Sequence, residues 1–112
     1  MPTSVIRPAS RYSLAAALLL GQLIRRARLE RKITVAQLAE RAGVSRSLAQ
    51  RIEKGDPSCS IGSVFEAAAV VGVRLFDADQ SSVSMAIQAN AQALALLPRA
   101  VRAPRIETKD DF

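Results

Sequence analysis

Gly43 divides the stretch Val35–Lys54 into two short amphipathic runs, and this break restricts the fold more than any other feature. In the first run, Leu38, Ala39 and Ala42 recur at spacings of three and four residues and therefore share one face of a helix. Glycine adopts a positive φ without a Cβ penalty, which a tight turn between two helices requires. The pattern predicts two helices joined by such a turn.

The second run begins after Val44, an apolar residue that can fill the angle between the two helices. Ser45 is an N-cap candidate, because its hydroxyl can accept a hydrogen bond from a free N–H group of the next helix. Ala49 and Ile52 turn inward, and the outward face bears Arg46, Ser47, Gln50 and Arg51. Basic and amide side chains on the outer face of such a helix are typical of helices that bind in the DNA major groove.

Positive charge is concentrated in the first half of the 112-residue chain, whose formal net charge is +6. Residues 1–55 contain eleven lysines and arginines but three acidic residues, whereas residues 56–112 contain five and seven. This asymmetry favours an anionic polymer as the partner of the first half, with a solvated charged face as the alternative. Aromatic residues make up only 4%, so alanine and leucine must form a thin core, which favours dimerisation.

The sequence contains no recognisable catalytic or metal-binding cluster. It has no histidine and one cysteine, Cys59, so we expect no zinc site and no intramolecular disulfide, and a reducing compartment. No glycine-rich phosphate loop and no nucleophile with a visible base are present, which predicts a protein that is not an enzyme and needs no cofactor. The apolar run Leu14–Ile24 is too short to span a bilayer and arginines follow it, so we expect neither a membrane segment nor a signal peptide.

Apolar periodicity and cap residues predict five helices. They are expected at Leu14–Lys32, Val35–Ala42, Ser45–Lys54, Ile61–Val71, and from Ser82 or Val83 to about Leu97. Two sets of side chains are expected to face the core, namely Leu20, Leu23, Ile24 and Ala27 in the first helix, and Val64, Phe65, Ala68 and Val71 in the fourth. After the fourth helix, Leu75 and Phe76 are expected to dock as an apolar clamp.

These helices suggest a division of the chain into four parts. We expect an N-terminal arm at residues 1–12, a DNA-binding domain at 13–78, a dimerisation helix at 79–97, and an extended tail with a disordered acidic end at 98–112. No charged residue lies between Asp79 and Arg99, and a helix with so little charge is normally buried, here in a dimer interface. Pro98 and Pro104 prevent a continuous helix, so a strand-like segment is expected near Ala100–Arg105.

The lambda-repressor-like family (Cro/CI, or XRE) has a helix-turn-helix that resembles the stretch VAQLAERAGVSRSLAQRIEKG. The shared features are the small residue Ala39, the turn glycine Gly43, and apolar residues at Leu38, Val44, Ala49 and Ile52. The resemblance extends from Leu20 to about Phe76. It implies an all-α, five-helix DNA-binding domain in a cytoplasmic, nucleoid-associated protein of bacterial type.

The resemblance also implies roles for individual side chains. Base-reading contacts in the major groove would come from Arg46, Ser47, Gln50 and Arg51. Contacts to DNA phosphates would come from the hydroxyl groups of Thr34, Ser45, Ser58 and Ser60 and from the cations Arg25 and Lys54.

The resemblance has two further implications, one for a buried ion pair and one for a phosphate contact. Arg28 and Glu53 fall where the family often buries an ion pair, whose role would be orientation, since buried pairs seldom add much net stability. Val35 stands where the family commonly has a glutamine that contacts phosphate, so that anchor is not expected here. Gln37, two residues later, is not assumed to replace it.

Outside the motif, the likeness is to HipB-like antitoxin regulators, through GDPSCSIGSVFEAAAVVGVRLFD, the LPRAVR segment and the acidic end. It implies a homodimer that binds a double-stranded DNA operator, represses its own operon, and forms a complex with a HipA-like Ser/Thr kinase toxin. Two alternatives stay open. One is a stand-alone or phage-type XRE repressor without a toxin, and the other is an adaptor that keeps the fold but binds only protein.

Overall fold

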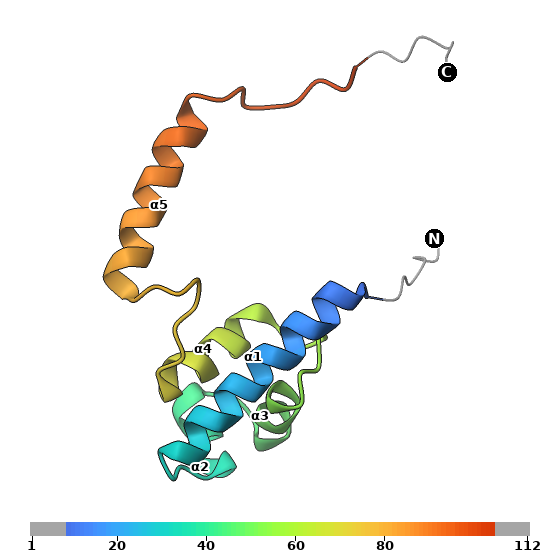
Figure 1. Ribbon diagram of the computed structural model, residues 1–112, viewed down its shortest axis with the longest axis vertical. Coiled ribbons are helices and arrows are strands. Elements are labelled where there is room, and N and C mark those ends of the chain that lie inside the picture. The colour runs from blue at the N-terminus through green and yellow to red at the C-terminus, as the bar shows by residue number, and fades with distance from the viewer. Residues whose placement is uncertain (1–8, 105–112) are drawn as a thin grey trace. The chain divides into compact units, whose positions relative to one another are not determined.

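The computed structural model describes residues 9–104, which form five helices and no β-strand (Figure 1). The helices are α1 (Arg11–Glu30), α2 (Val35–Ala42), α3 (Arg46–Glu53), α4 (Ile61–Val71) and α5 (Gln80–Ala95). The predicted all-α fold is confirmed. The bounds of α2 and α4 are those predicted, and α3 is one residue shorter at each end because the flanking residues are its caps.

Each helix begins after a side chain that accepts a hydrogen bond from the backbone N–H three residues later. These capping residues are Ser10, Thr34, Ser45, Ser60 and Asp79. Capping at Ser10 starts α1 at Arg11, so the last two residues of the predicted arm 1–12 belong to the helix, and residues 1–8 lie outside the described range. Capping at Asp79 likewise starts α5 two residues before the earliest predicted position.

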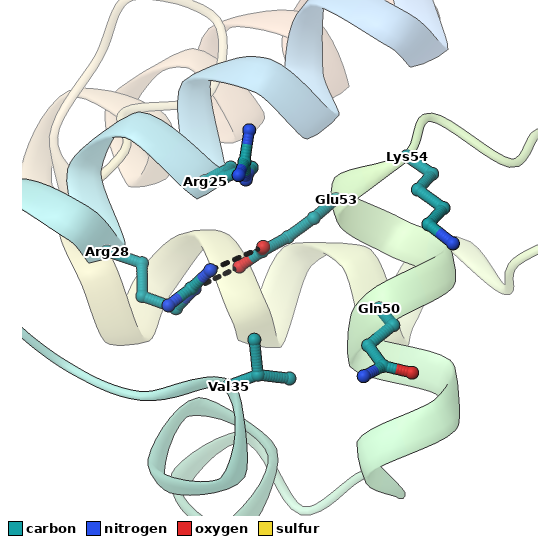
Figure 2. A pocket seen from close by; sticks show the side chains of 6 residues that line it. All are labelled: Arg25, Arg28, Val35, Gln50, Glu53 and Lys54. Carbon is teal, nitrogen blue, oxygen red and sulfur yellow. Dashed lines mark hydrogen bonds and ion pairs between the residues drawn. The ribbon is translucent and has the colours of Figure 1, made fainter.

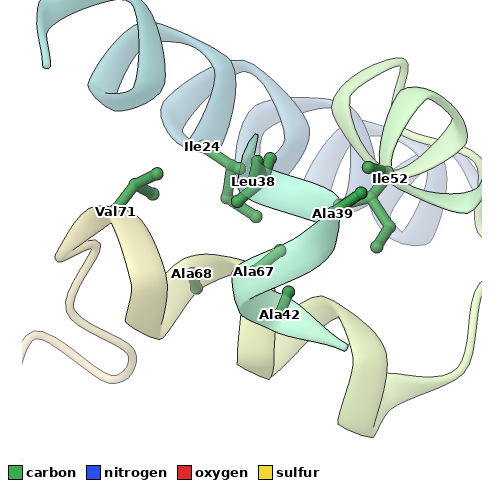
Figure 3. Packing of buried hydrophobic residues seen from close by; sticks show 9 residues of the cluster. Ile24, Leu38, Ala39, Ala42, Ile52, Ala67, Ala68 and Val71 are labelled. Carbon is green, nitrogen blue, oxygen red and sulfur yellow. The ribbon is translucent and has the colours of Figure 1, made fainter. Parts of the chain in front are cut away.

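Helices α1 to α4 pack around a small core (Figure 3). Its buried side chains are Ile24, Leu38, Ala39, Ala42, Ala49, Ile52, Ala67, Ala68 and Val71. The prediction for Leu23 is wrong, because Gly21, Ile24 and Arg28 form the buried stripe of α1 and leave Leu23 40% exposed. The predicted clamp is half wrong, because Leu75 packs against the core whereas Phe76 is 83% exposed.

The turn between α2 and α3 depends on Gly43, which adopts a φ of 72° in the left-handed region. The N–H of Val44 then donates to the carbonyl oxygen of Ala39 at 3.0 Å, which satisfies a free carbonyl at the end of α2. Ser45 is already extended, so only three residues separate the end of α2 from the start of α3. This sharp reversal sets the angle at which α3 leaves the core.

The distance between α1 and α3 depends on Gly21. A Cβ atom built there would lie 2.5 Å from the carbonyl oxygen of Ile52 and 2.9 Å from the backbone nitrogen of Gly55. Such distances are far inside van der Waals contact, so the backbone of α1 approaches the last turn of α3 as closely as only glycine permits. Gly21 therefore fixes how far α3 stands from the core.

The chain divides into two compact units, Met1–Asp77 and Ala78–Phe112. Helix α5, in the second unit, has no buried side chain in the single chain. Residues 101–104 have no regular secondary structure, so the expected strand-like segment forms no strand up to Pro104, where proline removes a backbone donor. Arg105 and the acidic end lie outside the described residues. No described helix is long and apolar enough to cross a membrane.

Candidate nucleic-acid interface

The outer face of α3 presents polar side chains that the fold leaves unused. Arg46, Ser47 and Gln50 are exposed, and none of them makes a side-chain hydrogen bond or ion pair within residues 9–104. The opposite face of the same helix is fixed, because Ala49 and Ile52 are buried in the core. An arginine, a serine and a glutamine therefore project from a rigid helix with their donors and acceptors free.

A hollow of about 520 Å³ lies beside this face, between α1, the start of α2, and α3 (Figure 2). Two cations on its rim, Arg25 of α1 and Lys54 at the end of α3, are exposed, and neither forms an ion pair with a described residue. Val35 and Gln50 line the side toward α2. The positive charge of two elements thus gathers next to the free amide of Gln50.

The Arg28–Glu53 ion pair forms the inner wall of this hollow (Figure 2). The Arg28 Nε and Nη2 groups donate to the two carboxylate oxygens of Glu53 at 2.6 and 3.0 Å, and both side chains are buried. The remaining arm, Nη1, donates to the carbonyl oxygen of Ile33 at 2.9 Å. One guanidinium therefore joins α1, the loop before α2, and the last turn of α3, and it fixes the direction of α3.

The capping hydroxyl groups of α2 and α3 differ from that of α4 in whether their protons have an acceptor. Thr34 and Ser45 accept hydrogen bonds from the backbone of α2 and α3, and their own protons have no acceptor among the described residues. Such a hydroxyl at a helix N-terminus can still donate to a phosphate. The hydroxyl of Ser60, in contrast, donates to Ser63 Oγ at 2.8 Å.

Arg51 is held by the loop that follows α3. Its Nε donates to Asp56 Oδ2 at 2.9 Å, and its Nη2 donates to Ser58 Oγ at 2.8 Å. The backbone N–H and the hydroxyl of Ser58 both donate to Asp56 Oδ1, at 2.8 and 2.7 Å. These two hydrogen bonds from Ser58, followed by the one from Arg51, lower the pKa of Asp56 to about 2. Of the outward side chains predicted to read bases, Arg51 alone is held in place by other described side chains.

Residues 19–78 match the helix-turn-helix domain family, over more than half of the chain. The chain belongs to this family. It is thus an XRE-like helix-turn-helix protein, and this family of DNA-binding domains is typically not enzymatic. Helices α2 and α3 are the two helices of the motif. Comparisons with curated proteins and with solved structures gave no match.

The structure of this helix-turn-helix protein brings Gln50 of α3 together with Arg25 and Lys54 around one hollow. The hydroxyl groups of Ser58 and Ser60 already donate hydrogen bonds to Asp56 and Ser63. Sequence analysis missed three features that position these residues, although each of them has a recognisable signal in the sequence. Asp56 stands two residues before Ser58, a spacing typical of an Asx turn. Thr34 and Gln37 form a reciprocal capping box, for which Thr-x-x-Gln is the sequence pattern. Gly21 lies inside a helix, where glycine is unfavourable, and this was the available signal of a close backbone approach.

Proposed function

We propose that this protein is a sequence-specific, DNA-binding transcriptional repressor that acts as a homodimer. The observation that supports it most is the polar face of α3 beside Arg25 and Lys54, two cations without an ion pair among residues 9–104, on a domain of the helix-turn-helix family. Free donors and acceptors on a rigid, exposed helix are what recognition of base edges in the major groove requires. In this proposal α3 enters that groove and α2 lies across it.

The proposed contacts fall into two groups with different consequences. Arg46 and Gln50 read bases, because a guanidinium pairs with guanine O6 and N7 and an amide pairs with adenine N6 and N7, and Ser47 and Arg51 complete this group. Arg25, Lys54, Thr34 and Ser45 hold the phosphate backbone and set the register of the domain. Ser60 is less suited to bind a phosphate because its hydroxyl already donates a hydrogen bond to Ser63 Oγ.

The proposed dimer interface is formed by α5. Its residues Val83, Ile87, Asn90 and Leu94 follow alternating spacings of four and three residues, as in the seam of a coiled coil. Ile87 and Leu94 are 63% and 62% exposed, and the helix contains no charged residue that would repel an identical helix. A second copy would cover this stripe, and the two α3 helices would then reach half-sites about 34 Å apart on a near-palindromic operator.

Selection of bound sequences from random duplex DNA, followed by affinity measurements on the selected site, tests the DNA-binding part. Arg46→Ala should reduce discrimination at one base pair per half-site, by roughly tenfold, whereas Arg25→Ala should weaken binding to all sequences alike and lower the salt dependence by about one phosphate. The promoter of the protein's own operon should contain the selected site. If neither substitution alters binding, these roles are wrong.

We further propose that the protein is the antitoxin of a HipA-like Ser/Thr kinase toxin and represses the operon that encodes both. The support is the likeness of the loop after α3 and of the tail to HipB-like regulators, together with the exposed apolar side chains of the second unit. Affinity purification from the native host should recover a kinase-like protein of several hundred residues. Recovery of the operator without any kinase would instead support a stand-alone XRE repressor, and recovery of protein without DNA would support an adaptor.

A further inference from the structure

Arg51 differs from the other outward residues of α3 because one edge of its guanidinium is already occupied. A guanidinium has five N–H donors, arranged so that Nε and one Nη form a side edge and the two Nη groups form an end edge. Asp56 and Ser58 accept from Nε and Nη2, which is the side edge. The end edge, with Nη1 and the second hydrogen of Nη2, has no acceptor within the described chain.

The loop that supplies these acceptors is itself fixed to α3. Gly55 adopts a φ of 78°, which reverses the chain just after the helix. The N–H of Asp56 then donates to the backbone carbonyl of Arg51 at 3.1 Å, and Ser58 is tied to the Asp56 carboxylate by two further hydrogen bonds. Arg51 is consequently held at its backbone and at its side chain by the same short loop.

We infer that Asp56 and Ser58 are positioning residues that direct the end edge of Arg51 toward a guanine in the operator. The end edge presents two parallel N–H groups, which match guanine O6 and N7, and a long side chain that is held before binding loses less conformational freedom on binding. The inference rests on the proposed DNA-binding function and reassigns Ser58, which sequence analysis placed on a phosphate.

Asp56 has a second effect, which gives the inference a distinctive test. Its low pKa keeps the carboxylate charged at every pH used for DNA binding, and an anion at the rim of a DNA-binding surface repels phosphates of any sequence. Removal of this charge should therefore strengthen non-specific binding while it weakens recognition of one guanine. A residue that served only to stabilise the loop would not move the two affinities in opposite directions.

The experiment uses the full-length protein, the duplex selected by the wild-type protein, single-base-pair variants of that duplex, and an unrelated duplex of equal length. Arg51→Ala should abolish discrimination at one guanine, by roughly tenfold. Asp56→Asn should reduce discrimination at the same guanine by several fold and should raise affinity for the unrelated duplex. Ser58→Ala should reduce discrimination there without raising non-specific affinity, since it removes no charge.

The control is Glu66→Gln, which removes one exposed acidic charge on α4 without touching Arg51. It should leave discrimination at that guanine unchanged. The inference is overturned if Asp56→Asn and Ser58→Ala, both still folded by circular dichroism, keep the discrimination that Arg51→Ala removes. It is also overturned if no base pair depends on Arg51. Failure of the wild-type protein to enrich any sequence would instead overturn the proposed function, and the inference with it.

Discussion

The buried Arg28–Glu53 pair shows how one side-chain contact orients α3, the proposed recognition helix. Both carboxylate oxygens of Glu53 and all three nitrogens of the Arg28 guanidinium are engaged, so neither charge is left without a partner in the interior. Because desolvation of two charges offsets most of their attraction, the pair adds little net stability. Its main effect is to fix α3 relative to α1, which places Gln50 and Lys54 around the same hollow.

Removal of one partner should be costly, whereas removal of both should be tolerated. Glu53→Leu leaves a buried guanidinium without its counter-charge, and we expect a loss of about 3–5 kcal/mol in the free energy of unfolding, measured by urea denaturation. Combination with Arg28→Met should restore much of that stability but not DNA affinity, because α3 is no longer held. The exposed Arg26–Glu30 pair is the control, and its removal should change stability very little. Equal losses in the single and double variants would contradict this account.

Rules that depend on nearest neighbours and helical periodicity identified several candidate site residues, but they did not reveal the hydrogen bond between Arg51 and Asp56. Ser45 and Thr34 were recognisable as caps because capping depends on neighbours within three residues. The outward direction of Arg46 and Gln50 followed from helical periodicity alone. The anchoring of Arg51 did not, because it depends on a chain reversal at Gly55 that returns Asp56 to the side of α3.

At the scale of secondary-structure elements, the crossing of α1 and α3 is the contact that most directly positions the proposed recognition helix. Gly21 lies at this crossing, against the backbone of Ile52 and Glu53. Glycine in a helix interior costs about 1 kcal/mol relative to alanine, so its presence indicates that the close approach gains more than that. The position of α3 against α1 thus depends on the absence of a side chain at Gly21.

Gly21→Ala should therefore destabilise the protein although alanine is the better helix former. The methyl group would meet the carbonyl oxygen of Ile52, and since backbone cannot move aside cheaply, we expect a loss of about 1–3 kcal/mol in the free energy of unfolding and weaker DNA binding. The matched control is Gly62→Ala in α4, where a Cβ meets nothing within 4 Å. That substitution should leave stability equal or slightly higher. If Gly21→Ala behaves like Gly62→Ala in thermal unfolding, α1 and α3 do not pack as described.

Helices α2 and α4 were predicted to the residue, whereas α1 and α5 begin two or three residues before their predicted positions. Helices α2 and α4 have both an N-terminal hydroxyl cap and a C-terminal glycine at positive φ, so the sequence marks both ends. Helix α1 was predicted to begin at Leu14, three residues too late, because the helix is capped by Ser10, before the apolar pattern begins. The strand-like segment expected near Ala100–Arg105 pairs with no other strand over residues 101–104, and a strand requires a partner that local sequence does not reveal.

At the scale of the whole molecule, the two compact units differ in charge. Most of the positive charge lies in the unit that ends at Asp77, whereas α5 in the other unit is uncharged. A helix of 16 residues with no buried side chain is marginally stable in water, so packing against a partner would stabilise α5. The charge asymmetry and the helical pattern were visible in the sequence, but neither shows what covers α5, because a single chain contains no interface.

A single charge on the proposed seam of α5 should separate dimerisation from folding. Ile87→Glu places a carboxylate on the apolar stripe, where a symmetric partner would bring a second one close, so we expect a monomer in sedimentation equilibrium. Affinity for an operator with two half-sites should then fall by roughly a hundredfold, because binding loses the effective concentration that links the two domains. Affinity for one half-site should not change, since the motif of Met1–Asp77 is untouched. Gln92→Glu adds the same charge on the opposite face of α5 and should remain dimeric. A dimer that survives Ile87→Glu would place the interface elsewhere, and two monomeric variants would indicate charge repulsion without a defined seam.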